Sequence, residues 1–150
     1  MTTAIRLIAL GRKISNLYAD LSAPLLREYG MNRTCFDVLM FCANQPEHNT
    51  ARDLCEMRGI KSGIASVAVE TLIAGGYLTR TPDAADRRKH RLVPTGKAAD
   101  LIRAGREMQA TFTDALRAGI TPEELHALER LTDTLEENLT RMGKGETVSC

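Results

Sequence analysis

The sequence predicts a mainly helical fold with one small β-hairpin. Of its 150 residues, 43% are hydrophobic and 26% are charged, which is typical of a globular chain rather than a disordered one. Aromatic residues make up 4% and tryptophan is absent, so the core is expected to be aliphatic, a composition that favours helices. Long stretches follow the 3.6-residue period of a helix, and only two short stretches have the character of strands. The length fits a single domain over residues 1–150.

Two helices are expected in the first third of the chain. Apolar residues recur every three or four positions over residues 3–29, and Gly30 ends this helix. Asn32 is a good N-cap for a second helix that runs to residue 43. A loop containing Pro46 follows.

A helix-turn-helix is expected next. Asn49 or Thr50 can cap a short helix over residues 51–58, which Gly59 ends, and a further helix covers residues 61–74. Two short helices joined by a tight glycine turn are typical of this motif.

The pattern then changes to that of a β-hairpin. Residues 77–80 and 90–93 predict two short strands, and a polar loop with a basic end joins them. Such a narrow cationic projection fits the minor groove of DNA, whose negative potential attracts it. Asp86 is expected to hold one arginine fork of the tip in a fixed direction. A charge run on a loop is, however, most often simply solvated.

Two helices are expected in the last third. The first covers about residues 95–118, and Thr121 and Pro122 supply an N-cap and a first-turn proline for the second, which reaches about residue 142. The last helix carries an apolar stripe at helical spacing. Its members are Leu125, Leu128, Leu131, Leu135, Leu139 and Met142.

Charge is unevenly distributed along the chain. The net charge is only +1, but residues 58–103 carry nine basic and four acidic side chains, whereas residues 104–150 carry five and nine. The basic centre favours a polyanion as partner for that part of the chain.

The expected recognition helix over residues 61–74 has a small and neutral outer face. A helical wheel places Ile64, Val67, Ala68, Thr71 and Leu72 toward the core. The same wheel places Ser62, Ala65, Ser66 and Val69 outside. Hydroxyl and methyl groups can read base edges, although an arginine fork is missing. An ordinary solvent-facing helix side is the alternative.

The hairpin sequence resembles that of MarR-type winged helix-turn-helix regulators. The resemblance rests on Gly76-Tyr77-Leu78-Thr79-Arg80, on Pro82-Asp83-Ala84-Ala85-Asp86-Arg87-Arg88 and on Leu92-x-Pro-Thr95. Helix order and spacing are similar from about residue 3 to residue 142. The resemblance implies a winged helix-turn-helix core over residues 32–94, dimerisation helices over 3–29 and 95–142, and a flexible tail over 143–150.

The resemblance also implies a function and a set of site residues. The expected function is that of a cytoplasmic repressor that binds a pseudo-palindromic DNA operator as a homodimer, with Arg88 entering the minor groove and Asp86 orienting it. Residues expected at the DNA are Lys61, Ser62, Ala65, Ser66 and Val69 of the recognition helix, Asp86, Arg87, Arg88 and Lys89 of the wing, and Thr50 at a phosphate. Residues expected in the dimer interface are Leu7, Leu10, Leu125, Leu128, Leu135 and Leu139.

The recognition helix departs from the family pattern. Where the family often has Thr-Arg, this chain has Ser66-Val67, so one expected DNA contact is missing. The alternative function is therefore a winged-helix protein-interaction dimer that has lost specific DNA binding.

Members of the family commonly respond to a small aromatic or phenolic effector or to cysteine oxidation. The residues expected to line an effector crevice are Tyr18, Phe36, Met40, Met108 and Phe112, with plain core packing as the alternative. Cys35 and Cys42 lie too far apart on one helix for a direct disulfide, so a thiol switch would need Cys55, Cys150 or a partner subunit.

Other functional classes have little support in the sequence. His48, His90 and His126 are scattered and predict no metal site, and no signature of a nucleophile surrounds any cysteine. We therefore expect no enzymatic activity and no cofactor. Secretory and membrane-spanning patterns are also absent from the sequence, which predicts a cytoplasmic protein without membrane association.

Overall fold

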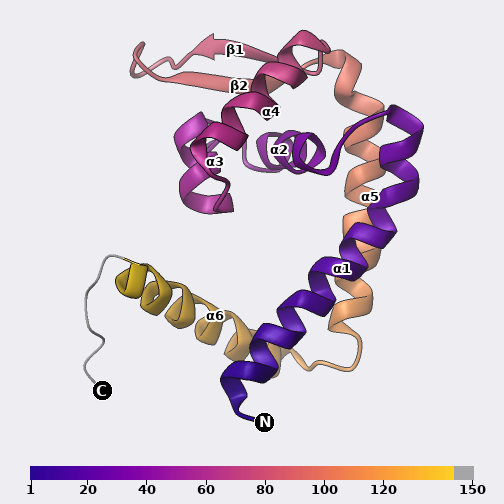
Figure 1. Ribbon diagram of the computed structural model, residues 1–150, viewed down its shortest axis with the longest axis vertical. Helices are drawn as coiled ribbons and strands as arrows, with labels where there is room; N and C mark the ends of the chain where they lie inside the picture. The colour runs from indigo at the N-terminus through magenta and orange to yellow at the C-terminus, as the bar shows by residue number, and fades with distance from the viewer. Residues whose placement is uncertain (144–150) are drawn as a thin grey trace. The chain divides into compact units, whose positions relative to one another are not determined.

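The computed structural model describes residues 1–143 of the chain (Figure 1), which fall into two compact units divided between Thr111 and Phe112. The first unit contains α1 (Thr3–Tyr29), α2 (Arg33–Asn44), α3 (Ala51–Arg58), α4 (Ser62–Ala74), β1 (Leu78–Pro82), β2 (His90–Pro94), the short 3-10 helix η1 (Gly96–Ala98) and most of α5 (Ala99–Arg117). The second contains the end of α5 and α6 (Pro122–Gly143). The mainly helical prediction with one hairpin is confirmed. Cys150 and the expected tail from residue 144 lie outside the described residues.

Local capping explains where the helices of the first unit begin and end. The side chain of Asn32 accepts a hydrogen bond from the amide of Cys35 at 2.8 Å, which starts α2. Gly30 and Gly59 end α1 and α3 with φ of 60° and 68°, a left-handed conformation that glycine adopts at little cost. These boundaries confirm the prediction.

The β-hairpin is antiparallel and slightly longer than the sequence predicted. Leu78 pairs with Pro94 and Pro82 pairs with His90 at its two ends. Leu78 and Leu92 are buried, so one side of the hairpin is fixed to the helices while its tip projects into solvent.

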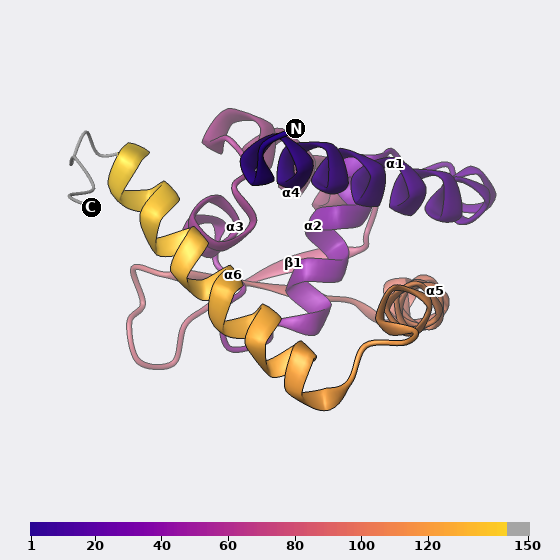
Figure 2. The same cartoon turned by 90° about the horizontal axis from the view of Figure 1, so that it is seen from below.

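The core of the first unit is built around α2, which lies among α3, α4 and the hairpin (Figures 1 and 2). Phe36, Leu39 and Met40 on α2 are almost completely buried. Gly105 on α5 lets that helix approach α2 closely, because a β-carbon there would lie 2.7 Å from the Met40 sulfur. The other fully or nearly buried apolar residues are Cys35, Val38, Cys42, Leu54, Ala65, Ala68, Val69, Leu72, Leu78, Leu92, Ala98, Leu101 and Ile102.

The helical wheel for α4 was wrong in part. Ala65 and Val69, expected outside, are about 2% exposed, whereas Ile64 and Val67, expected inside, are 51% and 68% exposed. Thr71 is also exposed, although it was expected inside. Small residues at 65 and 68 let α4 approach α2, with the Cys35 sulfur 3.9 Å from the carbonyl oxygen of Ala68. With this face buried, Ile64 and Val67 face solvent.

Uncovered apolar side chains follow α1 and α6. Within the described residues, α6 has no buried side chain, and its Leu128, Leu131, Leu135 and Leu139 are all exposed. The first half of α1 exposes Ile5, Leu7, Ile8 and Leu10 in the same way. In residues 1–143 no helix is both long and apolar enough to cross a membrane.

Candidate nucleic-acid interface

The first unit brings three elements to one surface: the start of α3, the outer side of α4 and the hairpin between β1 and β2 (Figure 1). A hollow between α3 and the hairpin is lined by several cationic side chains. They are Arg52 of α3 and Arg80, Arg88, Lys89 and Arg91 of the hairpin. Glu47, Asp53 and Glu56 also line the hollow, and Arg52, Arg80 and Arg91 form ion pairs with carboxylates. Arg88 and Lys89 are therefore the cations of this hollow that suit an anionic ligand such as a phosphate backbone.

The hairpin tip is shaped by carboxylates that accept backbone hydrogen bonds. Asp83 accepts from the amides of Ala85 and Asp86 at 3.1 and 3.0 Å, and Asp86 accepts from the amide of Arg88 at 3.0 Å. The expectation that Asp86 holds an arginine fork is therefore corrected. Its carboxylate contacts the backbone of Arg88, because a separation of two residues matches an Asx turn.

Three cations at the tip remain available to a ligand. Arg87, Arg88 and Lys89 are exposed, and within residues 1–143 their side chains form no ion pair. Their order along one turn agrees with the wing that the sequence predicted.

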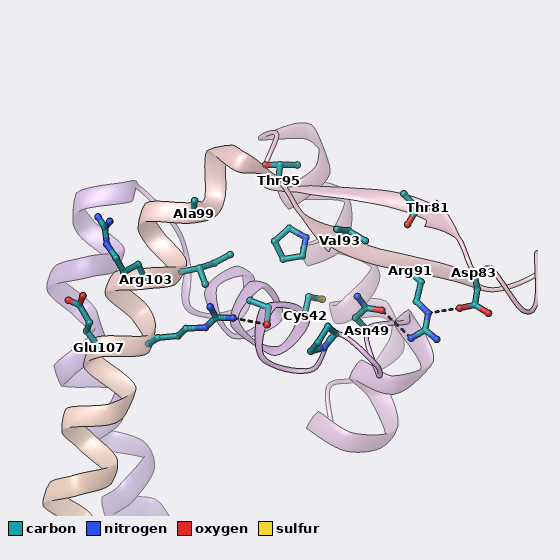
Figure 3. Close-up of a pocket in the computed structure, with 16 residues that line it drawn as sticks. Cys42, Asn49, Thr81, Asp83, Arg91, Val93, Thr95, Ala99, Arg103 and Glu107 are labelled. Atoms are coloured by element: carbon teal, nitrogen blue, oxygen red, sulfur yellow. Dashed lines mark hydrogen bonds and ion pairs between the residues drawn. The ribbon is translucent and has the colours of Figure 1, made fainter.

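The base of the hairpin is held by an arginine that the sequence analysis did not single out. Arg91 donates from Nε to Asp83 at 2.7 Å, and from one terminal nitrogen to the carbonyl of Glu47 at 2.6 Å and to Asn49 at 3.3 Å (Figure 3). Asn49 is buried and donates to the carbonyl of Leu92 at 3.1 Å. Arg91 therefore ties the hairpin to the loop before α3, and its hydrogen bond lowers the pKa of Asp83.

Thr50 occupies a different role from the phosphate contact that was expected. Its hydroxyl donates to the Asp53 carboxylate at 2.7 Å. The hydroxyl also accepts from the Asp53 amide at 3.2 Å while the Thr50 amide donates to the Asp53 carboxylate at 3.0 Å, and this reciprocal pair forms a capping box. Burial opposes ionisation of Asp53, but these hydrogen bonds outweigh it and lower the pKa of the carboxyl group. With its hydroxyl committed beside a carboxylate, Thr50 is poorly suited to meet an anion.

The outer side of α4 contains only part of the expected recognition surface. Lys61, Ser62 and Ser66 are exposed, and both serines line a small hollow between α3, α4 and the hairpin. Ala65 and Val69 line the same hollow but are about 2% exposed, so they have almost no surface to offer to a base. The prediction for these two residues was wrong.

Four of the residues named for the effector crevice lie in the core of the first unit or against it. Phe36 and Met40 are core residues against Gly105, and Tyr18 and Met108 pack against this core. The Tyr18 hydroxyl accepts a hydrogen bond from Gln109 at 2.8 Å. Phe112 lies in the second unit.

A larger hollow of about 790 Å³ lies instead between α2, the hairpin and α5 (Figure 3). Its apolar lining includes Cys42, Val93, Pro94 and Ile102, while Arg103, Arg106 and Glu107 supply charge. Arg106 is tied to the end of α2 by hydrogen bonds to Asn44 and Ala43.

The buried thiols have low reactivity. Burial raises the pKa of Cys42 to about 12 and also raises the pKa of Cys35, so both remain protonated at neutral pH. Cys55 is only half-buried. Across residues 1–143, His, Cys, Asp and Glu form no cluster suited to a metal ion.

Two short helices followed by a hairpin with a charged tip define the winged helix-turn-helix class. The sequence of residues 29–89 matches the family model of the MarR family. This match covers 61 of the 150 residues, and the chain as a whole has the MarR-like winged helix fold with N- and C-terminal helices. No curated protein sequence matches it.

Solved structures of MarR proteins share this fold at low sequence identity. A putative MarR regulator from Listeria monocytogenes, complexed with a 26mer DNA, has a TM-score of 0.73 and 19% identity over 100% of both chains. The MarR regulator from Oenococcus oeni has a TM-score of 0.72 and 21% identity, covering 88% of this chain and 97% of that one. BpsR from Bordetella bronchiseptica, whose DNA binding is described as regulated by 6-hydroxynicotinic acid, has a TM-score of 0.63 and 19% identity over 90% and 96%.

Proposed function

We propose that this protein is a MarR-type transcriptional regulator, a cytoplasmic homodimeric repressor that binds a pseudo-palindromic operator in double-stranded DNA. The observation that carries the proposal is the pairing of two unlike surfaces in one unit: a hairpin tip with three unpaired cations and an almost uncharged helix beside it. The tip suits the minor groove, and a helix of this diameter suits the major groove.

Each part of the surface has a proposed role. Arg88 enters the minor groove from the turn that Asp86 stabilises, while Arg87 and Lys89 contact phosphates. Ser62 and Ser66 face base edges, and Lys61 meets the backbone near the start of α4.

A second copy of the chain is the proposed cover for the apolar stripes of α1 and α6. Leu7 and Leu10 on α1 and Leu128, Leu135 and Leu139 on α6 are exposed in one protomer, and Leu125 is half-buried. Burying such stripes against a second copy removes apolar surface from water. A dimer also presents two recognition helices to successive major grooves, about 34 Å apart on one side of the duplex.

Regulation by a small aromatic or phenolic effector is part of the proposal. We place that molecule in the hollow between α2, the hairpin and α5, whose apolar lining and arginines suit an aromatic acid. Because Asp83 and Arg91 also line it, occupancy would act on the base of the wing. Thiol control is restricted to Cys55 and Cys150, since the other two thiols are buried.

Selection of bound sites from random duplexes, followed by titration against the selected duplex, tests this function. A dimer with several phosphate contacts should lose affinity steeply between about 50 and 200 mM salt. A dimer that binds no duplex at low salt would instead support the alternative function, a protein-interaction dimer. Reporter transcription with the selected operator then distinguishes repression from activation.

A further inference from the structure

We propose that Val67, with Ile64 beside it, reads thymine methyl groups in the major groove, so that each operator half-site carries at least one thymine at a position facing α4. This inference rests on the proposed DNA-binding function and names the sequence feature that the helix selects.

The exposure of these two side chains is the first observation. Val67 is 68% exposed and Ile64 is 51% exposed, although both belong to a helix whose other large aliphatic side chains are buried or half-buried. They are three residues apart, so they lie next to each other on the helix surface. Gly63 precedes them with open space around it, so no neighbouring side chain hides this apolar ridge.

The charge of α4 is the second observation. Glu70 is the one charged side chain among residues 62–74, and Arg80 of β1 forms an ion pair with it. The acidic group is therefore neutralised locally and does not repel a duplex. No arginine or lysine of α4 itself can form a bidentate contact with guanine.

The hydrogen-bonding groups on this side of the helix are also limited. Thr71 donates its hydroxyl hydrogen to the carbonyl of Val67 at 2.8 Å, so it has no hydrogen left for a base. Ser62 and Ser66 lie on the side toward α3 and the hairpin. The side that carries Val67 and Ile64 consequently meets its ligand through aliphatic carbon.

Major-groove chemistry then identifies the partner group. Of the four base pairs, only A·T and T·A present an apolar group in this groove, the C5-methyl group of thymine. Aliphatic side chains that face hydrogen-bonding base edges would leave those edges unsatisfied. The unpaired cations of the hairpin tip, Arg87, Arg88 and Lys89, supply the attraction to phosphate that holds the neutral helix against the bases.

The test uses the selected operator with single thymines replaced by deoxyuridine, which keeps base pairing and removes only the methyl group. For the unmodified protein we expect affinity to fall by about fourfold at one or two positions in each half-site, as for one buried carbon. Val67→Ala should bind the thymine operator more weakly and lose the deoxyuridine effect at its position. Val67→Thr keeps the shape of the side chain but replaces one γ-methyl group by a hydroxyl group. It should also lose the deoxyuridine effect if the replaced methyl group makes the contact.

Met57→Ala is the control, because Met57 is an exposed apolar residue of α3 rather than of α4. This variant should retain the full deoxyuridine effect. Binding that is tight and salt-dependent but insensitive to every deoxyuridine substitution would overturn the inference and leave the proposed function intact. Failure to bind any duplex would overturn both. A change in self-association of Val67→Ala, with an unchanged deoxyuridine effect, would assign this ridge to a protein partner and also overturn the inference.

Discussion

The winged-helix region and α6 differ in the burial of their apolar side chains. In the winged-helix region, α2 buries six residues and α4 buries four against elements of the same chain. In α6, which is longer than either of them, no residue is buried and four leucines are exposed. The chain thus contains one region whose core is complete and one helix that still lacks a covering surface.

This difference separates two sources of stability: contacts within one chain and contacts made on association. The winged-helix core is specified by contacts within one chain, so its stability should not depend on protein concentration. The stripe on α6 gains stability only from an association, so its contribution should depend on concentration. The following predictions test this separation, beginning with the largest expected effect.

Replacing Leu128 and Leu135 by Gln should weaken the dimer most strongly. Two leucines that become buried on association contribute about 3–6 kcal/mol in total, and polar replacements lose this contribution. Sedimentation equilibrium should show dissociation, and operator affinity should fall with it. Glu129→Gln, an exposed substitution on the same helix, is the control. A stable monomer that binds its palindrome as tightly as the dimer does would contradict the prediction.

Leu39→Ala should destabilise the winged-helix core by about 2–5 kcal/mol, because it leaves a cavity at a side chain with no exposed surface. Chemical unfolding should report this loss equally at low and high protein concentration. Leu131→Ala on α6 should lower the stability only at protein concentrations at which the dimer forms. A concentration-dependent effect at Leu39 would break the comparison.

Arg88→Ala should lower operator affinity by about 1–3 kcal/mol and leave the dimer intact. Fluorescence anisotropy with the selected duplex measures the loss, and sedimentation checks the dimer. Arg103→Ala removes an exposed arginine of α5, which forms an ion pair with Asp100, and serves as the control. Unchanged affinity for Arg88→Ala would reject the wing contact.

The smallest effect is expected from acid titration of Asp83. Because Arg91 lowers the pKa of this carboxyl group in the folded protein, the stabilisation is complete above the ordinary value of about 4 and is lost as pH falls through the lowered pKa. The NMR signal of the Arg91 Nε–H group should therefore stay constant from pH 8 to about pH 5 and shift in stronger acid. Asp83→Asn should abolish this titration; an unaltered titration would assign it to another group.

Local signals made most of the fold predictable from the sequence. Glycines at positions 30 and 59 and caps at Asn32 and Thr50 fix helix ends through contacts within a few residues, which a single sequence displays. The faces of α4 were not predictable in this way. Alanine and valine occur on several sides of that helix, and packing against α2 decided which of them are buried.

The candidate site shows the same limit. The exposure of the cations at the hairpin tip follows from the sequence, because burying so many charged side chains in a turn would be costly. The partners of Asp83 and Asp86 do not follow from it. Arg91 reaches Asp83 only after the hairpin has closed, and it reaches Glu47 and Asn49 across more than forty residues of chain.

The ion pair between Arg91 and Asp83 also limits how many counterions a wing can displace from DNA. Arg91 is already neutralised by Asp83. Of the wing, only Arg87, Arg88 and Lys89 can therefore neutralise phosphates and release the cations condensed on the duplex. Two wings then release at most about six counterions, which corresponds to a slope of roughly −5 in a plot of log affinity against log salt concentration. The proposed contact of Lys61 with the backbone would make the slope of the whole dimer steeper than this contribution of the wings.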